Sequence, residues 1–303
     1  MPLRPAEQRL GTISVLTAAV LFGTTGTVLA HAPAGATALG VGAARLAIGG
    51  PTLLIAARLY GARLTDLRPH LVTMVAGGVG AATFQLLYFV AATRTGVALG
   101  TVVTIGSGPV FSGAIHALST RHRPATAWVL GTTLGITGVG LLALTGDRTT
   151  VDAIGIAAAV GAGLGWASFT TTSKAQIRRG LDSALSLGAT FTTAAVLTAP
   201  LLFVEPMRWI SEGRGLVIAA YLGIATLAVA YLLYGRALSR LPAPTVITLT
   251  MAEPVTAALL AALVLHERVS SAGWLGIGLV VAGLTVTASA SPARVVVPRT
   301  VTS

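Results

Sequence analysis

Apolar segments recur along the whole chain, separated by short polar connections. Ten of these segments are long enough to cross a bilayer, since a membrane-spanning helix takes about 20 mostly apolar residues. They are predicted at residues 11–30, 37–59, 71–92, 97–118, 126–145, 152–173, 183–204, 215–234, 243–264 and 272–290. The segments lack the alternation of apolar and polar positions that a membrane β-barrel requires. The pattern therefore predicts an all-α membrane protein with ten transmembrane helices.

Composition agrees with this prediction and narrows the classes of function. Of the 303 residues, 54% are hydrophobic and 10% are charged, whereas an ordinary soluble domain has about 25% charged residues. Ten spans leave no loop long enough to hold a soluble domain. Cysteine is absent, which excludes disulfides, zinc–thiolate sites and iron–sulfur clusters. No cofactor is expected.

The positive charges indicate how the chain lies in the membrane. The net charge is +11, and the basic residues fall mostly between the apolar segments. If the N-terminus is cytoplasmic, 14 of the 20 Lys and Arg residues lie in cytoplasmic segments, five lie outside and Arg45 lies within a span. The positive-inside rule therefore predicts that both termini are cytoplasmic. No basic face or aromatic RNA-binding motif accompanies the charge, so nucleic acid is not an expected partner.

The first span also has features of a signal peptide. Arg4 and Arg9 precede its apolar run, and Ala30-His31-Ala32 resembles a cleavage site. The run is longer than the 7–15 apolar residues typical of signal peptides. A retained first span is therefore the favoured interpretation.

The two halves of the chain resemble each other. At offsets of 146 and then 145 residues, the positions that match are Gln85, Tyr88 and Arg94 with Tyr231, Tyr234 and Arg240, and then Pro109 and Gly138 with Pro254 and Gly283. Each half contains five predicted spans, and an odd number of spans places two copies in opposite orientations. The expected architecture is two inverted five-helix repeats, residues 1–146 and 147–290, followed by a cytoplasmic tail at 291–303.

Short motifs occur in a fixed order along this ten-span frame. In the first half they are Leu21-Phe22-Gly23, Ala44-Arg45-Leu46, Tyr88-Phe89-Val90-Ala91 and Gly108-Pro109-Val110. In the second half they are Trp166-Ala167, Tyr234-Gly235-Arg236-Ala237-Leu238, Glu253-Pro254-Val255, His266-Glu267-Arg268 and Trp274-Leu275-Gly276. Over nearly the whole chain this order resembles the EamA-domain family of the drug/metabolite transporter superfamily. The family often has Trp where Phe22 stands here.

The resemblance implies a carrier in the bacterial plasma (inner) membrane with a central cavity near the bilayer midplane. It implies export of amino acids or other small metabolites as the commonest activity, and it does not identify the substrate. The implied partners are a small-molecule substrate, the lipid bilayer and, if transport is coupled, protons. A homodimer is left open. No catalytic set and no nucleotide-binding motif is visible, so neither an enzyme nor ATP coupling within this chain is expected.

Glu253 is the only acidic residue deep inside a predicted span. Placing a carboxylate in hydrocarbon costs about 2.5–3.5 kcal/mol on insertion scales, so the group should face a cavity, pair with a cation or be protonated. It directly precedes Pro254, and a proline frees backbone groups in a helix. The functional interpretation is a proton-coupling acid or an anchor for a substrate amine. The alternative is a structural carboxylate that is hydrogen-bonded to a neighbouring helix.

Arg45 is the one basic residue within a span. Its guanidinium could bind a substrate carboxylate with two hydrogen bonds, or it could pair with Glu253 and neutralise it. The alternative is that its side chain extends to the membrane interface.

Polar and aromatic side chains at helical spacing are the further candidates for a substrate site. Gln85 and Tyr88 share one helix face, as do Tyr231 and Tyr234. The residues predicted to bind substrate are Phe22, Gln85, Tyr88, Trp166, Tyr231 and Glu253. For Tyr234 an anchor at the membrane interface is favoured, and for Trp166 core packing remains an alternative.

Prolines within the spans predict hinges, and glycine patterns predict close contacts between helices. Pro109 and Pro254 are predicted hinges in the fourth and ninth spans. The GxxxG patterns that begin at Gly96, Gly131 and Gly161 predict close contacts between helices.

The first functional hypothesis is a secondary exporter that works by alternating access, with the two repeats rocking around a midplane site. The runner-up is a proton-coupled exporter of lipophilic cationic drugs, in which Glu253 binds the drug. A membrane module without transport activity, such as a scaffold, is the third.

Overall fold

The computed structural model describes residues 5–143, 152–264 and 270–289, and this part of the chain consists of helices joined by short turns and loops. The first half contains α1 (Pro5–Leu29), α2 (Ala38–Leu59), η1 (Leu64–His70), α3 (Leu71–Thr95), α4 (Val97–Thr120) and α5 (Thr126–Ala143). The second half contains α6 (Ala153–Arg178), α7 (Ser183–Thr198), α8 (Leu201–Val204), η2 (Arg208–Ser211), α9 (Gly215–Gly223), η3 (Ile224–Val229), α10 (Ala230–Arg240), α11 (Ala243–Leu249), α12 (Ala252–Val264) and α13 (Ser271–Ser289).

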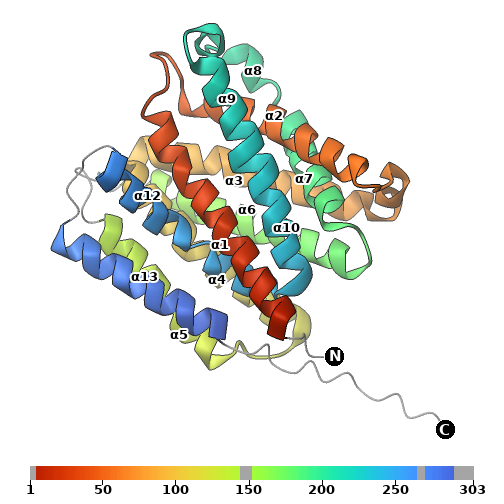
Figure 1. Ribbon diagram of the computed structural model, residues 1–303, viewed down its shortest axis with the longest axis vertical. Coiled ribbons are helices and arrows are strands. Elements are labelled where there is room, and N and C mark those ends of the chain that lie inside the picture. Colours follow the sequence, from red (N-terminus) through yellow and green to blue (C-terminus); the bar gives the residue numbers. More distant parts are fainter. Residues whose placement is uncertain (1–4, 144–151, 265–269, 290–303) are drawn as a thin grey trace.

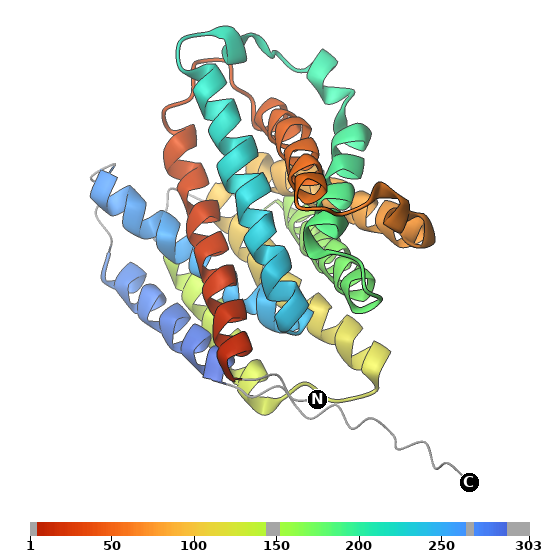
Figure 2. The ribbon, with the colours of Figure 1, turned by 45° about the vertical axis from the view of Figure 1, so that its right-hand side comes forward.

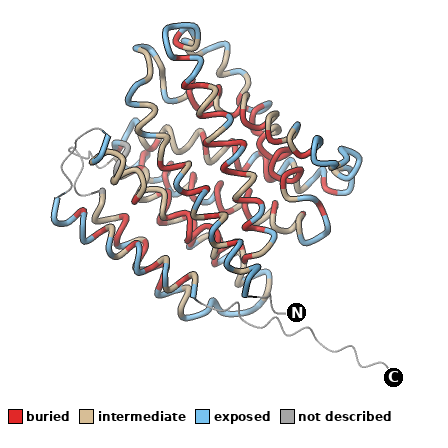
Figure 3. The backbone as a smooth tube through the Cα atoms, viewed as in Figure 1, coloured by how far each residue is buried: buried red, intermediate tan, exposed pale blue. Residues whose placement is uncertain are grey.

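Eight apolar helices or helix runs in the described part are long enough to cross a membrane, and the shorter α5 and α7 bring the spans to ten. Large apolar side chains such as Ile13, Val75 and Val281 are exposed on the outside of the bundle, whereas the buried residues gather inside it (Figure 3). Outward-facing apolar surface of this kind suits a lipid environment. The predicted all-α, multi-pass membrane fold is confirmed.

Three of the spans are interrupted. The seventh divides into α7 and α8 at Pro200, which has no backbone N–H to continue the helix. The eighth runs from α9 through η3 to α10, and η3 is a π-helix. The ninth divides into α11 and α12 at Thr250 and Met251. The sequence pattern predicted each of these spans as one continuous apolar segment, with a hinge at Pro254 in the ninth.

The break in the ninth span lies at one of the two predicted hinges. Pro254 has no N–H to donate to the carbonyl of Thr250. The Glu253 N–H donates to that carbonyl instead, with a nitrogen–oxygen distance of 2.9 Å. The matching helix in the first half, α4, continues unbroken through Pro109. The two prolines therefore have different local structures, and their role as hinges stays a prediction.

The two halves of the chain interleave rather than forming separate bundles (Figures 1 and 2). Helix α3 packs chiefly on α6, α2 on α7, α5 on α13, and α1 on α10 and α12. Two equivalent three-span groups result: α3, α4 and α6 form group A, while α1, α9–α10 and α11–α12 form group B. Each group mixes helices from both repeats. The packed groups therefore do not coincide with the two five-helix repeats, and rocking of one repeat against the other stays a prediction.

Glycine contacts between α5 and α13 show the symmetry of the two halves. A Cβ added to Gly131 would lie 2.7 Å from the Gly283 carbonyl oxygen, and one added to Gly138 would lie 2.6 Å from the Gly276 carbonyl oxygen. The sequence offset of 145 relates Gly131 to Gly276 and Gly138 to Gly283. Each contact is thus the image of the other, as expected for a two-fold relation.

A test of this packing is the Gly283→Ala variant. The added Cβ would meet the Gly131 carbonyl oxygen at 2.5 Å and the Gly135 nitrogen at 2.8 Å, so the helices must separate. We expect a loss of about 1 kcal/mol in stability, as for an overpacked core, seen as a lower thermal midpoint in detergent. Gly278→Ala on the same helix is the control, because its Cβ would have no neighbour within 4 Å. Equal midpoints for the two variants would contradict the expectation.

The three GxxxG patterns have different outcomes. Gly131 makes the contact described above, and Gly165 allows close packing of α6 on α3, where its Cβ would lie 2.7 Å from the Gly80 carbonyl oxygen. Gly96 is not at a helix contact. It forms the turn between α3 and α4 with φ of +83°, a conformation that glycine adopts at little cost. For this residue the prediction of helix packing is wrong.

Both described ends of the chain lie at the same end of the bundle. The Gln8 side-chain nitrogen of α1 donates to the Ala288 carbonyl oxygen of α13 at 3.3 Å. An even number of spans places both ends of a chain on the same side of the membrane. With the N-terminus predicted to be cytoplasmic, this end is referred to below as the predicted cytoplasmic end and the opposite one as the predicted external end.

Candidate substrate site

The four predicted aromatic site residues belong to one connected set of rings. The centroid of Phe22 in α1 lies 5.0 Å from that of Tyr231 in α10. Tyr231 also lies 4.1 Å from Phe191 and 6.0 Å from Phe169. The set continues from Phe169 through Phe84 to Trp166 and Tyr88, in steps of 6.2 Å each. This aromatic cluster joins groups A and B through the middle of the bundle.

Phe22 and Trp166 make comparable ring contacts in the two groups. Phe22 of α1 contacts Tyr231 of α10, and Trp166 of α6 contacts Phe84 of α3, which is next in sequence to Gln85, the residue that matches Tyr231. Trp166 is buried and lies against Gly108 of α4, where a Cβ would approach the indole ring to 2.6 Å. In this conformation Trp166 therefore packs between α4 and α6.

Arg45 is half-buried and does not extend to the membrane interface. It lies seven residues into α2, about 10 Å along the helix axis. Its Nη2 donates to the backbone carbonyl oxygen of Thr226 at 2.8 Å. Its Nε is buried and has no hydrogen-bond partner among the described residues. The Arg45 guanidinium is therefore held at Nη2, while its Nε–H donor is unused.

The π-helix η3 makes the Thr226 carbonyl available to Arg45. In an α-helix the Ala230 N–H would bond to the carbonyl four residues before it, that of Thr226. Here the Ala230 N–H bonds instead to the carbonyls of Ala225 and Leu227. π-helical turns are frequent at functional sites. Neither η3 nor its contact with Arg45 was predicted, since residues 224–229 are as uniformly apolar as the rest of the span.

Glu253 lies in the first turn of α12, beside the break after α11. It is half-buried, and its backbone carbonyl oxygen would lie 2.8 Å from a Cβ on Gly23 of α1. Its carboxylate interacts electrostatically with Arg45, but the two groups are not in ion-pair contact. The structure thus brings these two charges into one region without the direct pairing that the sequence analysis had considered.

Gln85 and Tyr88 lie on the same side of α3, facing this region. Gln85 is buried, and its amide nitrogen would lie 2.9 Å from a Cβ on Gly42, one helical turn before Arg45. The Tyr88 hydroxyl forms a hydrogen bond of 2.9 Å with the Thr101 hydroxyl of α4. Tyr88 also interacts electrostatically with both Arg45 and Glu253.

Tyr234 is not an interfacial anchor, so that prediction is wrong. Its side chain is fully buried, and its hydroxyl forms a hydrogen bond of 3.0 Å with the Thr170 hydroxyl of α6. The reason is that α10 continues to Arg240, which places Tyr234 more than a turn inside the helix. Its repeat match with Tyr88 was the signal in the sequence that could have revealed an interior tyrosine.

Groups A and B are packed together mainly at the predicted cytoplasmic end. There α11 packs on α4 and α6, and α10 packs on α6. The Lys174 Nζ of α6 donates to the Leu238 carbonyl oxygen of α10. Toward the predicted external end α12 packs chiefly on α1, with weaker contacts to α13 and α5. Glu253 lies in the first turn of α12, just beyond the α11 contacts that join groups A and B.

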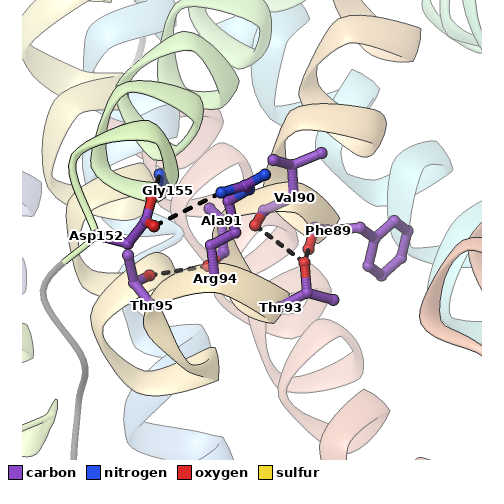
Figure 4. Close-up of polar contacts among 8 residues, drawn as sticks. All are labelled: Phe89, Val90, Ala91, Thr93, Arg94, Thr95, Asp152 and Gly155. Carbon is purple, nitrogen blue, oxygen red and sulfur yellow. Dashed lines mark hydrogen bonds and ion pairs between the residues drawn. The ribbon is translucent and has the colours of Figure 1, made fainter.

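Group A is tied together at the predicted external end (Figure 4). Asp152 caps α6 by accepting a hydrogen bond of 2.7 Å from the Gly155 N–H, and it forms an ion pair of 3.6 Å with Arg94 at the end of α3. The side chains are 48% and 35% exposed, so the ion pair contributes at most about 1 kcal/mol. It holds α3 and α6 in register.

Two hollows of about 440 and 480 Å³ lie away from these residues. One is lined by α9 and η3, and the other by α1, α11 and α13. Neither contains a predicted substrate-binding residue, so the expected midplane cavity stays a prediction. Within residues 5–143, 152–264 and 270–289, no three His, Asp or Glu side chains are placed to hold a metal ion.

Comparison with known proteins identifies the family. The model of the EamA-like transporter family matches residues 9–144 and again residues 153–289. "Uncharacterized transporter YwfM" of Bacillus subtilis (strain 168) is 38% identical over 277 residues, covering 91% of this chain and 93% of that protein. "Threonine/homoserine exporter RhtA" of Escherichia coli (strain K12) is 32% identical over 250 residues, covering 80% and 79%.

A solved structure described as "Crystal structure of protein" supports the fold. It superimposes with a TM-score of 0.78 at 22% sequence identity, over 91% of this chain and 95% of the other. The duplicated family match, the ten apolar spans and the two-fold glycine contacts agree with one another. The family consists of transporters rather than enzymes, and this chain belongs to the EamA-like transporter family.

Proposed function

We propose that the protein exports amino acids or related small metabolites by alternating access around a site near the bilayer midplane. The observation that carries the proposal is the presence of Arg45 and Glu253, one from each repeat, within apolar spans, where they interact electrostatically without ion-pair contact. Charged groups inside a membrane protein are costly and usually mark a transport pathway. The similarity to a protein named as a threonine/homoserine exporter supports amino acids as the first class to test.

Alternating access is assigned to groups A and B rather than to the two repeats. The candidate residues come from both groups: Gln85, Tyr88 and Trp166 from A, and Phe22, Tyr231 and Glu253 from B. The groups are in contact at the predicted cytoplasmic end. Separation there, with closure at the opposite end, would load substrate from the cytoplasm and release it outside. The helix break before Pro254 is the point at which α11 and α12 could move independently.

The bacterial inner membrane is the proposed location, with both termini cytoplasmic. The excess of Lys and Arg in the predicted cytoplasmic segments supports this orientation. The proposal requires only one chain and a small-molecule substrate, and it leaves both a homodimer and proton coupling open.

Lipophilic cations are the less favoured substrates. Glu253 alone would attract a cation, but Arg45 lies within electrostatic reach of the same carboxylate and repels one. A small molecule that carries both charges is compatible with both side chains.

Counterflow in proteoliposomes tests the proposal. We expect purified protein to exchange labelled threonine or homoserine, and to exchange lipophilic cations at no more than the rate of protein-free vesicles. Exchange of cations alone would favour the drug-exporter alternative. Folded protein that exchanges no member of an amino-acid and metabolite panel, at acid and at neutral pH, would overturn the proposal.

A further inference from the structure

Arg45 presents an incomplete set of hydrogen bonds in the middle of a membrane protein. The Thr226 carbonyl holds its Nη2 at 2.8 Å, whereas its buried Nε has no partner among the described residues. A buried donor without a partner costs free energy comparable to a lost hydrogen bond. A side chain that is fixed at one nitrogen and unsatisfied at another is positioned to receive an acceptor.

The bond to Thr226 directs the guanidinium without neutralising it. A backbone carbonyl is an uncharged acceptor, so Arg45 keeps its full positive charge. The Thr226 carbonyl is available because the Ala230 N–H bonds to the carbonyls of Ala225 and Leu227 instead. The matching helix of the first half, α3, has no such segment. The repeat fold therefore does not require the π-helix, and its effect here is to position Arg45.

Glu253 supplies the opposite charge and does not contact Arg45 directly. The two side chains interact electrostatically but are not in ion-pair contact. Both residues are only partly exposed, and both lie within apolar spans. Tyr88 and Tyr231 interact electrostatically with both charges. The region thus combines a cation, an anion and aromatic rings.

We infer that Arg45 and Glu253 form a two-ended clamp for a small zwitterion, in which Arg45 binds the carboxylate and Glu253 binds the ammonium group. The inference rests on the proposed function and adds which group of the substrate each residue recognises. A guanidinium matches a carboxylate in geometry and charge. Removing either charge from the substrate leaves one end of the clamp buried and unpaired, and such sites reject the incomplete analogue strongly.

The test compares threonine with two analogues in the same counterflow assay. Threoninamide lacks the carboxylate charge, and N-acetylthreonine lacks the ammonium charge. We expect wild-type protein to exchange threonine at least about tenfold faster than either analogue. Equal exchange of threonine and threoninamide would overturn the clamp while leaving amino-acid export in place. Exchange restricted to metabolites that are not zwitterions would also overturn the clamp while leaving metabolite export in place, and exchange of no member of the panel would overturn both.

Variants of Arg45 provide the second part of the test. Arg45→Gln is expected to raise the KM for threonine about tenfold or more and to remove the preference over threoninamide, while Arg45→Lys keeps part of that preference. Arg214→Gln, at an exposed position in the loop before α9, is the matched control. A purely structural role for Arg45 would lower the amount of folded protein or the maximal rate and leave the order of the analogues unchanged. That outcome would overturn the clamp. If Arg45→Gln does not fold, the wild-type analogue series decides the question alone.

Discussion

Replacing Glu253 by glutamine is expected to lower amino-acid counterflow by about a hundredfold. Glutamine keeps the size and shape of the side chain but removes the charge. Loss of one partner of a buried charged contact costs about 2–5 kcal/mol, and a hundredfold lies within that range. Glu253 is the one acidic residue deep within a predicted span, and it lies beside the break between α11 and α12. Counterflow of labelled threonine in proteoliposomes is the measurement.

Two comparisons separate the possible roles of Glu253. Glu212→Gln is the control for charge removal, since Glu212 is exposed in the loop before α9. If the Glu253 variant retains exchange but no longer accumulates substrate in response to a pH gradient, the carboxylate couples protons and does not anchor the substrate. Unchanged exchange and unchanged accumulation at every pH tested would contradict both roles.

Hydropathy was sufficient to predict the spans because a helix that crosses a bilayer is marked by its length and its apolar composition alone. The ten apolar segments and the inverted repeat follow from composition, segment length and the odd number of spans per half. The irregular segments could not be predicted in the same way. At Gly49 a Cβ would lie 2.6 Å from both the Gly223 carbonyl oxygen and the Leu227 Cβ, so α2 presses directly against the start of η3. The π-helix thus lies at a tertiary contact, and residues 224–229 carry no local signal of it.

The candidate site was predictable only where a residue differs in kind from its surroundings. Arg45 and Glu253 could be singled out because charges are rare within apolar spans. Phe84, Phe169 and Phe191 complete the aromatic cluster, but an apolar ring in an apolar helix gives no signal of its role. The Thr226 carbonyl is a backbone group, so the type of its side chain gives no signal of its contact with Arg45. The interleaving of the two halves was equally hidden, because it depends on contacts between distant segments.

The Lys174→Met variant is expected to open the predicted cytoplasmic end more often. The Lys174 Nζ of group A donates to the Leu238 carbonyl oxygen, in the last turn of α10 in group B. A cation at the C-terminal end of a helix also interacts favourably with the helix dipole. Hydrogen bonds to charged groups contribute about 1.5–3 kcal/mol, so losing this one should increase the open population about tenfold. Methionine retains the length of the side chain without the charge.

The readout is a single cysteine in place of Ser173, because the natural chain contains no cysteine. Ser173 is fully buried and lies one turn along α6 from Thr170, on the face that meets Tyr234. Its thiol should react with a maleimide only when groups A and B separate. We expect the Lys174→Met background to raise the labelling rate about tenfold, since labelling follows the open population. Arg179→Met removes an exposed charge nearby and should leave the rate unchanged. Equal rates in all three backgrounds would show that the Lys174 contact does not hold this end closed, and the assignment of movement to groups A and B would lose its support.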